Sequence, residues 1–88
     1  MKPKLILFIK AISDPTRLRM LHQLRKQCCV GEIWEKLELP QNLTSHHLKV
    51  LREAGLITAE KRGMKVIYCL NNKILADNLK LLETYLIK

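Results

Sequence analysis

The segment QNLTSHHLKVLREAG, residues 41–55, has the pattern of a helix with one apolar face and one polar face. Thr44, Leu48 and Leu51 recur at steps of four and three residues, which places them on one inward-facing stripe. The opposite face carries short polar side chains near its start and mostly cations further along: Asn42, Ser45, His46, Lys49, Arg52 and Glu53. Short polar side chains let a helix approach base edges in the major groove of DNA, which is roughly 12 Å wide, while Lys and Arg reach phosphates.

Both ends of this predicted recognition helix are marked in the sequence. Pro40 stops the preceding element, Asn42 suits the N-cap position, and Gly55 suits the left-handed position that ends a helix. Upstream, residues 28–38 are predicted to form a short third helix, whose apolar stripe is Val30, Ile33, Trp34 and Leu37. A tight turn then joins two short helices, which is the arrangement of a helix-turn-helix.

The pattern changes from helix to strand after Gly55. Runs of β-favouring residues begin at Leu56 and at Val66, and Lys61–Lys65 separates them. Gly63 supplies the positive φ that a hairpin turn needs. A basic hairpin directly after a recognition helix is typical of the wing of a winged helix, whose tip reaches the minor groove or the DNA backbone.

The two ends of the chain are predicted to be helices with more apolar surface than one small core buries. The first begins at Pro3, a second begins at Asp14 and Pro15, and the last is capped by Asn71 or Asn72. The surplus predicts a homodimer built from the two terminal helices. Its expected interface residues are Leu5, Phe8, Ile9, Leu75, Leu79, Leu82 and Leu86. The predicted fold is mainly α with a small β-hairpin, in the order α-α-α-α-β-β-α.

Length and charge predict a single small domain that binds a polyanion. The 88 residues are expected to form one domain, residues 1–88. Sixteen Lys and Arg against eight Asp and Glu give a formal charge of +8 and a pI near 9.7, which is typical of nucleic-acid binding. Lys10 interrupts the apolar opening MKPKLILFIKAI, so we expect an amphipathic helix there, no membrane segment and a cytoplasmic protein.

The cysteines are odd in number, and Cys28 and Cys29 are adjacent, so no disulfide framework is predicted and a reducing cytosol fits best. These two are expected near the start of the third helix, where the helix dipole favours thiolate. They are candidates for an effector site that senses redox state or a thiophilic metal; inert, partly buried thiols are the alternative. Cys69 is expected in the core or on the surface of the sheet.

A metal site at the two histidines and catalytic chemistry are not expected from this sequence. His46 and His47 are neighbours, and neighbouring helix positions point about 100° apart, so they do not converge on an ion. We expect His46 to contact DNA and His47 to be partly buried and supporting. No Ser-His-Asp set, phosphate-binding glycine loop or convergent pair of carboxylates is visible, so the prediction is a protein that is not an enzyme and has no cofactor.

Three segments closely resemble the ArsR/SmtB family of transcriptional repressors: SDPTRLRML (13–21), TSHHLKVLREAGLI (44–57) and RGMKVIYCL (62–70). The resemblance implies a dimeric winged helix that binds an inverted-repeat operator in double-stranded DNA. It also implies dissociation when a metal ion, metalloid or oxidant reaches a sensor site. By position, it implies base or phosphate contacts from Asn42, Leu43, Ser45, His46 and Lys49, and backbone contacts from Arg62 and Lys65. Arg52, on the same polar face of the helix, is expected to anchor phosphate.

The sequence departs from the family's sensor motifs. Gly31 replaces the second cysteine of a Cys-x-Cys pair, and Leu79 stands where a second metal site has its first His. Thiol-sensing relatives pair a Cys-Val-Gly-Glu segment with a C-terminal cysteine that has no counterpart in these residues. The predicted function is a sequence-specific homodimeric repressor, released by a thiol-reactive or metal effector. The alternative is a winged-helix module that binds proteins without reading DNA, and the basic polar face argues against it.

Overall fold

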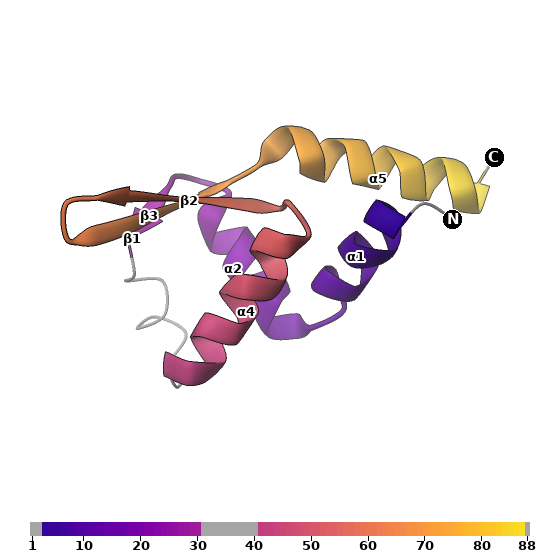
Figure 1. The fold of residues 1–88 in the computed structure, drawn as a ribbon. Helices are drawn as coiled ribbons and strands as arrows, with labels where there is room; N and C mark the ends of the chain where they lie inside the picture. The colour runs from indigo at the N-terminus through magenta and orange to yellow at the C-terminus, as the bar shows by residue number, and fades with distance from the viewer. Residues whose placement is uncertain (1–2, 31–40, 88) are drawn as a thin grey trace.

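The structure is a computed structural model that describes residues 3–30 and 41–87. Within these ranges the elements in chain order are α1 (Pro3–Ile12), α2 (Pro15–Leu24), β1 (Cys29–Val30), α4 (Gln41–Glu53), β2 (Ile57–Arg62), β3 (Lys65–Leu70) and α5 (Asn72–Ile87). Figure 1 shows the β2–β3 hairpin extending at one end of the molecule, while α1 and α5 lie together towards the other end. No helix within the described ranges is long and apolar enough to cross a membrane.

Side-chain caps begin two of the helices where the sequence predicts them. Oδ2 of Asp14 accepts a hydrogen bond from the backbone N–H of Arg17 at 3.0 Å, and Pro15 occupies the first turn of α2. Oδ1 of Asn71 accepts from the N–H of Ile74 at 3.2 Å, so Asn71 is the cap of α5. In each helix the cap side chain therefore accepts from a backbone N–H of the first turn that has no partner within the helix.

The recognition helix α4 ends as predicted, but its start differs from the prediction. Gly55 has a φ of +76°, which confirms its left-handed position after the helix. The helix begins at Gln41, so Asn42 lies inside it and the prediction of Asn42 as N-cap is wrong. Sequence patterns place helix ends only to within one or two residues, because neighbouring polar residues suit the same position.

The wing is an antiparallel hairpin, as predicted. β2 and β3 pair from Ile57 with Leu70 to Arg62 with Lys65, so Gly63 and Met64 alone form the turn. Gly63 has the predicted positive φ, at +62°. The strands include Lys61, Arg62 and Lys65, which belong to the segment that the sequence predicts between them. The cations near the turn are therefore held on paired backbone.

A third strand, β1, stands where the sequence predicts a helix. The start of the predicted third helix is wrong, because Cys29–Val30 pairs antiparallel with β3, giving the strand order β1-β3-β2. The rest of that predicted helix, residues 31–38, lies outside the described residues. Cys28 forms a disulfide with Cys69 of β3, and their Cα atoms are 4.4 Å apart, so the prediction of no disulfide is also wrong. This pairing depends on the register of strands distant in sequence, which local patterns do not carry.

An aliphatic core lies where α1, α2, α4 and the start of β2 meet. Thr44, Leu48 and Leu51 are buried, which confirms the predicted inward stripe of α4. The apolar members of the core are Leu5, Phe8, Ala11, Met20, Leu21, Leu24, Leu48, Leu51, Leu56 and Ile57. Because each buried side chain of this size contributes about 1.5–3 kcal/mol, the inner face of α4 is firmly held and its outer face is presented to solvent.

Candidate nucleic-acid interface

The outer face of α4 exposes the polar side chains that the sequence assigns to DNA contact. Ser45, His46, Lys49 and Arg52 are all exposed, and so is Leu43. Asn42 lies in the first turn of the same helix, and its side chain is outside what the structure describes. The face thus combines hydrogen-bonding groups near the N-terminal end with cations further along, which suits base edges and phosphates respectively.

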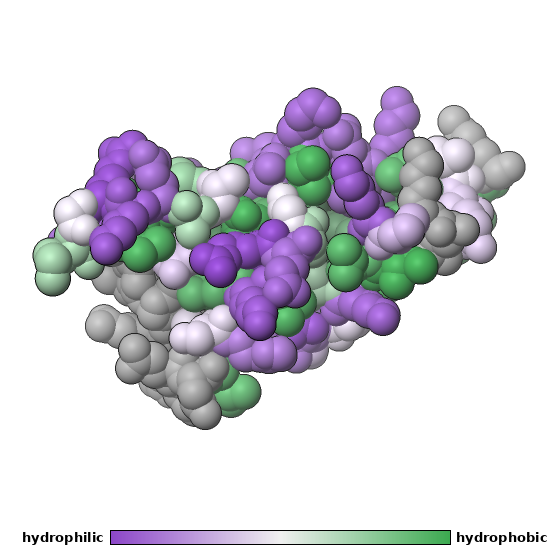
Figure 2. Space-filling model, in the orientation of Figure 1, coloured by the Kyte–Doolittle hydropathy of each residue, from purple (hydrophilic) through white to green (hydrophobic). Residues whose placement is uncertain are grey.

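The hairpin adds a second cationic surface to that of α4. Lys61, Arg62 and Lys65 are exposed beside the turn, and Met64 at the tip is 99% exposed. Figure 2 shows hydrophilic side chains gathered over this end of the molecule. One cation is partly engaged, because Nη2 of Arg62 lies 3.4 Å from Oε2 of Glu60. Both partners are largely exposed, so a phosphate can compete for the guanidinium.

A guanidinium contact that the sequence did not reveal fixes α4 to the end of α1. Arg17 donates through Nε to the carbonyl of Ala11 at 2.7 Å and through Nη2 to that of Lys10 at 3.1 Å. Its Nη1 lies 3.2 Å from Nδ1 of His47. Guanidinium groups only donate, so Nδ1 is the acceptor and His47 is neutral, with its proton on Nε2. No spacing rule points to a pair thirty residues apart in sequence.

Electrostatics at this junction agree with a neutral imidazole. Burial lowers the pKa of His47 below its ordinary value of 6.5; the carboxylate of Asp14 opposes that shift and Arg17 adds to it. The backbone hydrogen bond from Arg17 lowers the pKa of the Asp14 carboxyl below 3.8. His47 is 8% exposed, so it is more deeply buried than the partly buried position predicted for it.

The two candidate effector cysteines, although adjacent in sequence, have different structural positions. Cys28 is bridged to Cys69, and Cys29 belongs to β1, with a side chain that is outside what the structure describes. Neither stands at a helix N-terminus within the described residues, because Cys28 follows the end of α2. In residues 3–30 and 41–87, no three His, Cys, Asp or Glu side chains gather as they would around a metal ion.

The terminal helices leave apolar side chains in solvent. Leu5 and Phe8 of the predicted dimer interface are covered by the chain's own core, whereas Leu79 and Leu86 are 49% and 70% exposed. Ile9, Leu75 and Leu82 are half-buried. Four further apolar residues that are not among the predicted interface residues are exposed on α1 and α5: Ile6, Leu7, Tyr85 and Ile87.

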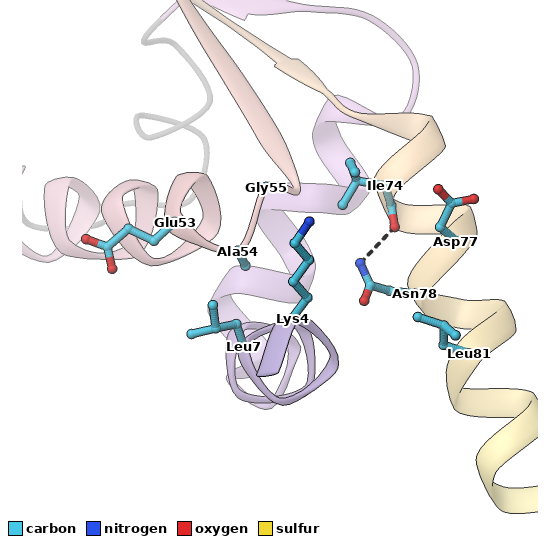
Figure 3. Close-up of a pocket in the computed structure, with 9 residues that line it drawn as sticks. All are labelled: Lys4, Leu7, Glu53, Ala54, Gly55, Ile74, Asp77, Asn78 and Leu81. Atoms are coloured by element: carbon cyan, nitrogen blue, oxygen red, sulfur yellow. Dashed lines mark hydrogen bonds between the residues drawn. The ribbon is translucent and has the colours of Figure 1, made fainter. Parts of the chain in front are cut away.

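A hollow of about 350 Å³ lies between α1, the end of α4 and α5 (Figure 3). Leu7, Ile74 and Leu81 supply apolar walls. Asn78 is buried beside it, and its Nδ2 donates to the carbonyl of Ile74 at 2.9 Å, one turn earlier in α5. The hollow thus adjoins the apolar surface that α1 and α5 expose.

These features, a recognition helix held on a small core and followed directly by a basic antiparallel hairpin, define a winged helix-turn-helix protein. The family described as "Bacterial regulatory protein, arsR family" matches residues 14–59. The chain belongs to this family, as its sequence resemblance implied.

Named relatives of the chain are transcriptional regulators. The HTH-type transcriptional repressor SmtB of Mycobacterium tuberculosis is 42% identical over 69 residues, covering 77% of this chain and 51% of the repressor. This chain therefore spans about half the length of that relative. The transcriptional repressor SdpR of Bacillus subtilis is 34% identical over 80 residues, covering 90% of this chain and 89% of SdpR.

A third relative has a solved structure. HlyU of Vibrio cholerae, named as a transcriptional activator, is 34% identical over 81 residues, covering 91% of this chain and 75% of HlyU. A solved structure of HlyU matches with a TM-score of 0.76 at 30% identity, and the match covers 100% of both chains. The winged-helix architecture predicted from the sequence is confirmed.

Proposed function

We propose that the protein is a sequence-specific DNA-binding transcriptional regulator that represses genes by binding an inverted-repeat operator. The observation that carries this proposal is the exposed polar and cationic face of α4 beside the basic hairpin. Asn42, Ser45 and His46 read base edges, with Leu43 beside them, while Lys49, Arg52, Arg62 and Lys65 anchor phosphates. SmtB and SdpR are named repressors, so repression is the outcome we propose.

The regulator acts as a homodimer in the cytoplasm. Exposed apolar residues on both terminal helices supply one surface that two copies cover by a twofold axis: Ile6, Leu7, Leu79, Tyr85, Leu86 and Ile87. Twofold pairing would set the two α4 helices to read half-sites about one helical turn of DNA apart, roughly 34–36 Å. The operator is therefore a pseudo-palindrome. The protein contributes no catalytic chemistry and needs no cofactor for this task.

Selection from a pool of random DNA duplexes tests the proposal. The wild-type chain is expected to enrich an inverted repeat, and its affinity should fall steeply with salt because cations displace condensed counterions. Ser45→Ala with His46→Ala should lose the preference for the enriched sequence while keeping weak, salt-dependent binding. The matched control changes two exposed residues on α2, His22→Ala with Gln23→Ala, and should keep the preference. Full discrimination by the Ser45/His46 variant would overturn the base-reading assignment.

A further inference from the structure

The Cys28–Cys69 disulfide closes a loop that contains the whole DNA-contacting surface. Cys28 lies between α2 and β1, and Cys69 lies in β3, the central strand of the sheet. The two cysteines are 41 residues apart in sequence, and α4, β2 and the turn of the hairpin all lie between them. A covalent bond at this point therefore constrains the recognition helix and the wing together.

The base of the wing is held from two sides, by the end of α4 and by β1. On the α4 side, the N–H of Leu56 donates to the carbonyl of Leu51 at 3.0 Å, and the N–H of Asn71 donates to the carbonyl of Leu56 at 2.8 Å. On the other side, within the described residues, Cys29 and Val30 of β1 pair with β3. Two strand pairs are a marginal link by themselves, since strands usually have about five or six residues. The disulfide adds a covalent link on that side.

We propose that Cys28 and Cys69 are a reversible redox pair whose closure fixes the wing against the segment between α2 and β1 and so tightens DNA binding. The inference rests on the proposed function, because a regulator that meets DNA in the cytoplasm works in a reducing compartment. Disulfides are rare there, and those that occur are usually transient and sense or carry redox change. Cys28 is exposed and Cys69 half-buried, so the bridge is within reach of small thiols.

The reductant is a low-molecular-weight thiol, and the oxidant is the disulfide of that thiol. In reduction, a thiolate attacks Sγ of the exposed Cys28, the bond between the two sulfurs breaks, and Cys69 leaves as a thiolate that takes up a proton. A second small thiolate then attacks the mixed disulfide at the small molecule's sulfur and releases Cys28. Two small thiols thereby become one small disulfide, and two electrons pass to the protein. Oxidation is the reverse sequence.

Closure should strengthen binding because it orders the wing before DNA arrives. In the reduced protein, the base of the hairpin keeps its contacts with α4 and the two described strand pairs with β1 but loses the covalent link to Cys28. The reduced protein must then order the β1 side of the hairpin when it binds DNA, which costs conformational entropy. The oxidised protein has already lost this entropy before binding. We expect about a tenfold difference in affinity between the two forms, within the range usual for coupling between two sites.

Mass spectrometry tests the pairing without DNA. The whole chain is equilibrated with reduced and oxidised glutathione in varied ratio, alkylated and digested without reductant. The expected result is a Cys28–Cys69 cross-linked peptide that forms and disappears reversibly, with Cys29 alkylated throughout. A main cross-link that includes Cys29, or a Cys28–Cys69 bridge that never forms or resists excess reduced glutathione, would overturn the proposal.

Affinity for the duplex enriched by the wild-type chain tests the consequence. Oxidised wild type is expected to bind about tenfold more tightly than reduced wild type. Cys28→Ser and, independently, Cys69→Ser should bind alike with and without reductant, at the affinity of the reduced protein. Cys29→Ser separates the two possible partners of Cys28 and should respond to redox state as wild type does. A redox response that survives Cys28→Ser, or equal affinities of the two wild-type forms, would contradict the coupling.

The two proposals fail in different ways. If neither redox form binds any duplex, the proposed function fails and the coupling to DNA fails with it, while the cross-linked peptide still decides whether the reversible pair exists. If both forms bind DNA equally, the proposed function stands and the redox coupling alone is overturned.

Discussion

Nη1 of Arg17 lies 3.2 Å from Nδ1 of His47, and this contact joins the end of α1 to the inner face of the recognition helix. The same guanidinium also donates to the carbonyls of Lys10 and Ala11. A protonated His47 would present a second donor to a group that has no acceptor, and would place two positive charges side by side. The junction is therefore stable only with a neutral imidazole.

The first prediction is a loss of stability in mild acid that depends on His47. Its pKa in the folded chain is below the ordinary value of 6.5, so the unfolded chain takes up the proton first as the pH falls. Neutral His47 contributes its full stabilisation above about pH 6.5. This stabilisation is lost as the pH falls below 6.5 towards the lower pKa that His47 has in the folded chain. Urea unfolding from about pH 8 to about pH 5 measures it, above the range in which Asp14 titrates.

His47→Gln keeps an acceptor for Arg17 but does not titrate, so it should show a flatter dependence on pH than wild type. His46→Gln is the matched control, since it changes the neighbouring exposed histidine and should keep the wild-type dependence. Identical pH profiles for wild type and His47→Gln would show that the junction does not sense protonation.

A second prediction concerns the cap of α2. Asp14→Ala removes the carboxylate that accepts from the N–H of Arg17 and should lower the free energy of unfolding by about 1 kcal/mol. Asp14→Ser retains an acceptor and should recover most of that loss. Urea denaturation near neutral pH measures both, and equal stability of Asp14→Ala and wild type would be the contradicting result.

Local signals in the sequence account for the elements that were predicted correctly. Asp14 caps a helix through a hydrogen bond three residues away, Gly55 and Gly63 meet the need for positive φ, and helical periodicity puts Leu51 in the core. The Cys28–Cys69 bridge and strand β1 were missed because they depend on which strands pair and in which register. The Arg17 contact with His47 was missed for a related reason, since it exists only when α1, α2 and α4 are packed.

A third prediction uses the ion pair on the wing. Glu60 holds Arg62 in an exposed pair, so Glu60→Gln should free the guanidinium for phosphate and tighten DNA binding about two- to fivefold. Lys65→Ala should do the opposite and reduce the salt slope of log K by about one, as expected for one lost phosphate contact. Fluorescence anisotropy over a range of salt concentrations measures both. Unchanged slopes in Lys65→Ala would place the wing away from DNA.

A fourth prediction concerns the disulfide and the stability of the isolated protein. Closing a loop of 41 residues restricts the unfolded chain, so reduction should lower the free energy of unfolding by about 3–4 kcal/mol. Guanidinium unfolding with and without reductant measures the difference. Cys69→Ser should match reduced wild type in both conditions; a reductant-dependent loss of stability in that variant would point to another bridge.

The last prediction concerns the apolar surface of the terminal helices. Leu79→Glu should drive the homodimer towards monomers, because it replaces an apolar contact with a charge. A twofold interface contains the substitution twice, and each lost leucine costs about 1.5 kcal/mol or more. The dissociation constant of the dimer should therefore rise on the order of 10²-fold, since about 1.4 kcal/mol is tenfold. Leu18→Glu on α2 is a matched control, because Leu18 has the same 49% exposure but lies outside α1 and α5. Sedimentation velocity should show monomers for Leu79→Glu at concentrations where Leu18→Glu remains dimeric; equal dissociation of the two variants would place the interface elsewhere.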